Sequence, residues 1–135
     1  ILRYPNAIRP WQHVLEPLSG YLKLSEKLYT EGPEFAEAWN FGPKKSDEKT
    51  VKWIVEQIVL KWGGGSWKSD DKSHPHETQC LKLDCKKANN RLFWRPVWDI
   101  NEALSKTVDW YKMYFQDKNS IRKKTIEQIN EYVNS

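Results

Sequence analysis

The run Ile8-Arg9-Pro10-Trp11-Gln12-His13-Val14-Leu15-Glu16-Pro17 constrains the fold more than any other stretch of this 135-residue sequence. Residues 8–14 alternate as in an extended segment, which places Arg9, Trp11 and His13 on one side. Glu16 and Pro17 then predict the start of a helix, because proline suits the first helical position and a carboxylate there complements the helix dipole. The stretch is therefore predicted to be a strand that leads directly into a helix.

The rest of the sequence predicts a mainly helical α+β domain that spans residues 1–135. Apolar residues at helical spacing extend the first helix to the Gly32-Pro33 stop. Two capping patterns, Asp99 with Glu102 and Thr125 with Gln128, predict the starts of the last two helices. Further helices are expected over 51–62 and 86–92, and short strands over 38–42, 66–68 and 81–84.

Composition and charge exclude several classes of protein. The net charge is +4, but Lys and Arg are interspersed with acidic residues, which is typical of a solvated surface and not of a nucleic-acid footprint. No apolar run approaches 18 residues, so neither a membrane span nor a signal peptide is expected. Cys80 and Cys85 are predicted to be free thiols in a cytoplasmic protein.

A second informative run is His74-Pro75-His76-Glu77, in a segment that is predicted to be a polar loop. Polar groups that a scaffold holds in irregular backbone usually mark a binding surface. We therefore expect His74, His76 and Glu77 to line an anion-binding site together with Arg9, Trp11 and His13. Arg9 is the strongest candidate, because a guanidinium makes a two-pronged contact with phosphate oxygens.

No metal, cofactor or catalytic site is expected in this segment. The spacing of the two Cys and of the His pair is not that of a zinc knuckle or ribbon. Gly63-Gly64-Gly65-Ser66 lacks the Lys of a phosphate-binding loop and the spacing of a dinucleotide fingerprint. Tyr114 and Lys118 have a Tyr-x-x-x-Lys spacing but fall at the end of an amphipathic helix, so a chance match is favoured.

Several motifs together resemble the C-terminal part of the CDP-glucose 4,6-dehydratases, within the extended short-chain dehydrogenase/reductase family. The resemblance spans essentially the whole chain. The two runs quoted above are its most specific elements, and the others are Glu37-Ala38-Trp39-Asn40-Phe41-Gly42-Pro43, Leu81-Lys82-Leu83-Asp84-Cys85, Trp94-Arg95-Pro96-Val97-Trp98, Lys106-Thr107-Val108-Asp109-Trp110-Tyr111 and Thr125-Ile126-Glu127-Gln128-Ile129.

The resemblance implies an enzyme in two halves that takes part in deoxysugar biosynthesis. A Rossmann half binds NAD and carries the catalytic groups, and a smaller C-terminal half closes over CDP-glucose. This chain would be that second half of a homo-oligomeric lyase, and inactive alone. In related enzymes an arginine at the place of Arg9 contacts the nucleotide diphosphate. Relatives often have a second diphosphate-binding arginine where this chain has His74.

An alternative from another class is a free-standing, non-catalytic module that binds a carbohydrate or a nucleotide sugar. The two hypotheses predict different parent reading frames. An upstream glycine-rich dinucleotide motif would favour the enzyme, and a start codon at this boundary would favour the module.

Overall fold

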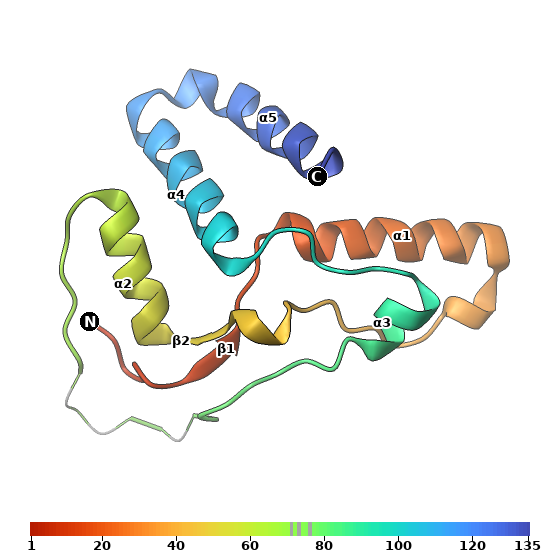
Figure 1. The fold of residues 1–135 in the computed structure, drawn as a ribbon, viewed down its shortest axis with the longest axis horizontal. Helices are drawn as coiled ribbons and strands as arrows, with labels where there is room; N and C mark the ends of the chain where they lie inside the picture. Colours follow the sequence, from red (N-terminus) through yellow and green to blue (C-terminus); the bar gives the residue numbers. More distant parts are fainter. Residues whose placement is uncertain (71, 73, 76) are drawn as a thin grey trace.

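The structure is a computed structural model that describes residues 1–70, 72, 74, 75 and 77–135, and over these residues it is a mainly helical α+β fold, as predicted. Five α-helices and two short strands make up the described fold (Figure 1). The elements are β1 (Ile8–Pro10), α1 (Leu15–Glu31), β2 (Glu48–Thr50), α2 (Val51–Trp62), α3 (Lys86–Arg91), α4 (Ile100–Gln116) and α5 (Ile121–Val133), with 3-10 turns η1 (Pro33–Phe35), η2 (Lys45–Asp47) and η3 (Lys118–Ser120).

Strand β1 has neighbours on both sides. It pairs antiparallel with β2, and Arg9 lies opposite Lys49. On its other side, Ile8 forms a parallel bridge with Cys80, through the bonds Ile8 N to Gln79 O (2.8 Å) and Leu81 N to Ile8 O (3.1 Å). This three-part arrangement holds the segment that follows the His-Pro-His-Glu run beside the start of the chain.

Helix α4 starts with the predicted cap, and α2 has local capping chemistry at both ends. The Thr50 hydroxyl accepts a hydrogen bond from Trp53 N at 3.2 Å, and Gly63 ends α2 in the left-handed region with φ of 94°. The Asp99 carboxylate accepts from the backbone N–H groups of Asn101 and Glu102 at 2.8 and 3.0 Å. The predicted bounds of α2 and the predicted start of α4 are thereby confirmed.

The apolar core has two centres. One lies between α1, α3 and the segment that joins them, and consists of Phe35, Phe41, Ala88, Leu92 and Trp94. The other lies between α2 and the start of α4, and consists of Ile54, Ile100 and Leu104. In Figure 1, α4 and α5 form a helical hairpin beside α2, and the end of α5 comes back toward α1.

The three strands predicted over 38–42, 66–68 and 81–84 are wrong. Residues 38–42 and 81–84 are irregular, and the 66–68 region contributes only a bridge between Leu2 and Ser69. A strand requires a neighbouring strand to accept its ladder of hydrogen bonds. No described residue gives 38–42 such a backbone partner, although Phe41 still packs in the core.

The start predicted for the last helix is also wrong. Helix α5 begins at Ile121, one turn before Thr125. Thr125 is therefore an interior residue of the helix, and its hydroxyl donates to Ile121 O at 2.9 Å. Gln128 is buried, and its amide donates to Lys106 O of α4 at 2.8 Å. The Thr-x-x-Gln pattern therefore links α5 to α4 and does not cap a helix.

None of the helices in the described residues has the length and hydrophobicity that crossing a bilayer would require.

Candidate functional site

The Arg9 guanidinium and the Glu77 carboxylate form an ion pair beside β1. The other guanidinium nitrogen donates to Ile8 O at 2.8 Å, which fixes the side chain against its own strand. The Arg9 side chain is only 18% exposed, whereas that of Glu77 is 48% exposed. The structure thus places Arg9, the leading candidate of the first run, in contact with Glu77, the last residue of the His-Pro-His-Glu run.

Tyr4 holds the second run in place from the start of the chain. Its hydroxyl donates to Pro75 O, and its ring lies edge-on to His74, with 6.0 Å between the ring centroids. His74 Nε2 lies 3.1 Å from Asp70 Oδ2, in a close approach that is not aligned as a hydrogen bond. His76, the remaining candidate of this run, lies outside the described residues.

A cavity of about 350 Å³ adjoins this contact. Its walls carry basic, acidic and amide side chains together with a tyrosine ring. Arg3 also lines the cavity and supplies a cation, besides Arg9, which is paired with Glu77. The lining residues are Arg3, Tyr4, Pro5, Asn6, Ala7, Glu77 and Gln79.

Trp11 has a packing role in this structure. Its indole N–H donates to Lys49 O of β2 at 2.9 Å, and its ring packs against the core of Ile54 and Leu104. The extended segment predicted to reach Val14 ends at Pro10, because Trp11 N donates back to Arg9 O at 3.1 Å in a tight turn. The prediction that Arg9 and Trp11 lie on the same side of one extended segment therefore does not hold beyond Pro10.

His13 is buried and supports the start of α1. Its Nδ1 accepts a hydrogen bond from Leu15 N at 3.3 Å, and its ring packs edge-on to Trp98 at 4.9 Å. Burial, followed by the nearby Lys106 ammonium, lowers the pKa of His13 below its ordinary value, so the imidazole is neutral at pH 7. It also lines an apolar cavity of about 330 Å³ between the start of α1, α4 and α5.

Of the candidates that the structure describes, it thus joins Arg9 to Glu77, holds His74 beside Tyr4, and places Trp11 and His13 in the packing of the helices. Sequence reasoning missed Arg3, Tyr4 and Asp70, which position or adjoin the cluster. A signal was present for Tyr4, since an aromatic residue before a proline at the start of the chain suits a fixed loop. Among the described residues, no group of three His, Cys, Asp or Glu is placed to hold a metal ion.

The arrangement of helices around a small antiparallel pair is shared with a sugar-nucleotide dehydratase of known structure. The chain superposes on part of the dTDP-glucose 4,6-dehydratase of Bacillus anthracis strain Ames, a crystal structure in complex with NAD, with a TM-score of 0.63 and 22% identity. The match covers 89% of this chain and 35% of that one. At this level of identity the likeness concerns the fold.

The sequence itself is similar to CDP-glucose 4,6-dehydratase of Salmonella typhimurium strain LT2, with 51% identity over 122 residues. That match covers 90% of this chain, and the chain spans about a third of the relative, 34% of its length, in the C-terminal part. No family model matches the sequence. The resemblance predicted from the motifs is confirmed by this identity.

Proposed function

We propose that the chain is the nucleotide-sugar-binding portion of an NAD-dependent CDP-glucose 4,6-dehydratase, and that Arg9 binds the diphosphate of CDP-glucose. The observation that carries the proposal is the meeting of the Arg9 guanidinium with Glu77 of the His-Pro-His-Glu run. The two most family-specific motifs of the sequence thereby form one site. The identity to the Salmonella enzyme supports the choice of substrate.

Glu77 accepts from one terminal guanidinium nitrogen of Arg9, the position that a diphosphate oxygen would take. A carboxylate and a phosphate both accept parallel N–H···O bonds from arginine. On binding, the diphosphate replaces the carboxylate, and Glu77, half exposed, turns to solvent or to a sugar hydroxyl. Arg3 lies on the same cavity and offsets part of the second phosphate charge. His74 stands where relatives often have an arginine, and it contributes mainly hydrogen bonds at the side of the site.

The proposal assigns NAD to another part of the protein, because the glycine run in the described residues does not fit a dinucleotide site. Gly63-Gly64-Gly65 directly follows the C-terminal end of α2, whereas a dinucleotide site needs a glycine-rich turn between a strand and the start of a helix. The proposal therefore assigns NAD, which would accept and return the hydride, and all catalytic groups to a Rossmann half outside these residues. The part of the chain described here binds and orients the sugar nucleotide.

Exposed apolar surface on α1 supports a docking partner of that kind. Tyr29, Leu22 and Leu18 are 93%, 73% and 44% exposed, on a helix that packs on Phe41 through Gly20 and Tyr21. Contiguous apolar surface of this kind marks an interaction site. The neighbouring segment 38–42 has no backbone partner among the described residues. The occupant that we propose is the NAD-binding half, which corresponds to the two thirds of the relative that this chain does not match.

The test is calorimetric titration of the full-length polypeptide with CDP-glucose. Arg9→Ala is expected to weaken binding by about 10-fold or more, because it removes charge-assisted hydrogen bonds to phosphate. NAD affinity should stay unchanged. Arg9→Lys keeps the charge but loses the planar fork, so an intermediate loss is expected.

Arg122→Ala is the matched control, since it removes the same charge from an exposed position at the start of α5. Equal CDP-glucose affinities for the Arg9→Ala and Arg122→Ala proteins would refute the role of Arg9. A parent reading frame that encodes only this segment would instead favour the non-catalytic binding module.

A further inference from the structure

A second cavity is separate from the Arg9 site, and its charged lining residues are mostly cations. It measures about 710 Å³ and lies between the 42–48 segment, the 82–89 segment and the Arg95-Pro96 corner. Five cationic side chains line it, Lys44, Lys45, Lys82, Lys86 and Arg95, against the two carboxylates Glu48 and Asp84. The excess is three positive charges.

The walls of this cavity are fixed to one another. The Asn40 amide donates to Asp84 O at 3.3 Å. Gly42 packs so closely on Leu83 and Cys85 that an added Cβ would lie 3.0 Å from the Leu83 side chain and 3.2 Å from the Cys85 sulfur. Burial raises the pKa of the Cys85 thiol, so this floor is neutral and unreactive at pH 7. The cavity is therefore a built feature and not a gap between loose loops.

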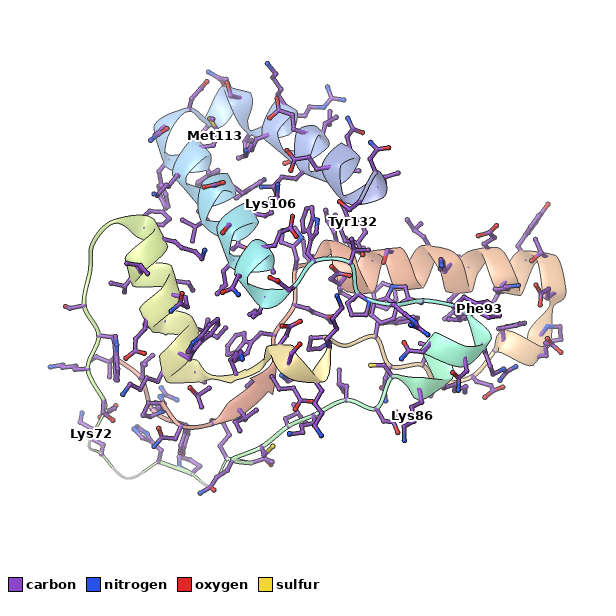
Figure 2. The ribbon with its side chains drawn as sticks, in the orientation of Figure 1. Lys72, Lys86, Phe93, Lys106, Met113 and Tyr132 are labelled. Atoms are coloured by element: carbon purple, nitrogen blue, oxygen red, sulfur yellow. The ribbon has the colours of Figure 1, made fainter. Side chains whose placement is uncertain are left out.

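Most of the cationic side chains that line the cavity have no ion-pair partner among the described residues. Lys82 is paired with Glu48 at 2.6 Å. For Lys44, Lys45, Lys86 and Arg95, the described residues provide no ion-pair partner. Lys86 stands at the start of α3, labelled in Figure 2. Like charges around a concave surface raise the local potential and attract anions.

A buried amide group adds a second polar feature. Asn89 of α3 lines the cavity, and its buried Oδ1 has no hydrogen-bond partner among the described residues. Buried polar atoms of this kind are normally satisfied. Because this oxygen is closed off from the cavity, a ligand would bind through the cations, and Asn89 serves only as a nearby reporter.

We propose that this cavity is a second anion-binding site, which takes a small molecule with two or more phosphate groups. It is distinct from the Arg9 site and does not depend on the proposed dehydratase function. Volumes of 300–1,000 Å³ are usual for small-molecule sites, and the cavity falls within this range.

The test uses tripolyphosphate as the probe, titrated by calorimetry into the full-length polypeptide at low and at moderate salt. Lys86→Ala/Arg95→Ala removes two unpaired cations from the cavity and is expected to weaken binding by 10-fold or more. Arg122→Ala/Lys123→Ala is the matched control, since it removes one arginine and one lysine from the exposed start of α5. Its affinity should stay within twofold of the parent. In spectra labelled with ¹⁵N, the Asn89 side-chain amide should shift on addition of the probe.

Four outcomes would overturn the proposal. They are no binding of tripolyphosphate to the parent protein, equal weakening in both double variants, weakening by Arg9→Ala alone, and binding of a single-stranded oligonucleotide without binding of tripolyphosphate. Because the proposed function is read out by CDP-glucose and Arg9→Ala, and this site by tripolyphosphate and Lys86→Ala/Arg95→Ala, either can fail without the other.

Discussion

The Glu16 carboxylate accepts a 2.7 Å hydrogen bond from the Tyr132 hydroxyl, and so joins the first turn of α1 to the last turn of α5, 116 residues later. The same carboxylate accepts from Val97 N and Trp98 N at 3.0 and 2.8 Å. Glu16 is fully buried, and Figure 2 shows Tyr132 reaching from α5 toward α1. One buried side chain thus ties together α1, the segment before α4 and α5.

Replacement of Glu16 should therefore be among the most destabilising single changes in the chain. Glu16→Ala leaves three hydrogen-bond donors without their acceptor, and unsatisfied buried groups cost about 1–3 kcal/mol each. We expect a loss of roughly 3–5 kcal/mol in the free energy of unfolding, measured by urea denaturation. Glu16→Gln keeps the shape and one acceptor oxygen, so a smaller loss of about 1–2 kcal/mol is expected.

Glu26→Ala is the control, because Glu26 lies on the exposed side of the same helix. It should change stability by less than about 0.5 kcal/mol. If Glu16→Ala is as mild as Glu26→Ala, the carboxylate does not hold the three segments together.

His13 predicts a dependence of stability on pH. Its folded-state pKa lies below the ordinary value of 6.5 because of burial first and the Lys106 charge second. Below pH 6.5 the unfolded chain therefore binds more protons than the folded one, so stability is present above pH 6.5 and falls as the pH is lowered toward the folded pKa. Denaturation between pH 7.5 and pH 5 should show this loss.

In His13→Asn the side-chain oxygen can still accept from Leu15 N, but the titrating group is gone. The pH slope in this window should accordingly shrink relative to the parent protein. An NMR titration of the imidazole gives a direct check. A His13 resonance that titrates above 6.5 would contradict the assigned burial effect.

Local chemistry in the sequence predicts the helices well and the strands poorly, for a physical reason. The signals that start or end α2 and α4 are local: Thr50, Gly63 and Asp99 act on backbone groups within a few residues. A strand at 38–42 depends on a distant neighbour, and the described residues offer none. The strand prediction there rests on a local preference, which needs a partner strand to be realised.

The candidate site shows the same division. Arg9 and Glu77 were each predicted from motif chemistry, and the structure adds that they meet. The packing of Trp11 and His13 could not be predicted from their neighbours in the sequence, because the groups they contact lie on β2 and before α4. Glu16 was predicted to complement a helix dipole, whereas its three partners come from residues 97, 98 and 132.

Gly20 provides a test of the contact between α1 and the irregular segment below it. A Cβ at Gly20 would lie 2.3 Å from the Phe41 ring, which is buried between Tyr21 and Trp94. Alanine usually stabilises a helix interior relative to glycine by about 1 kcal/mol, but here the overlap should outweigh that gain. We expect Gly20→Ala to lower the free energy of unfolding by about 1–3 kcal/mol, as overpacked cores do.

Gly64→Ala, where a Cβ meets nothing within 4 Å, should be close to neutral in the same urea titration. A Gly20→Ala protein at least as stable as the parent would mean that α1 and Phe41 are not in close contact in solution.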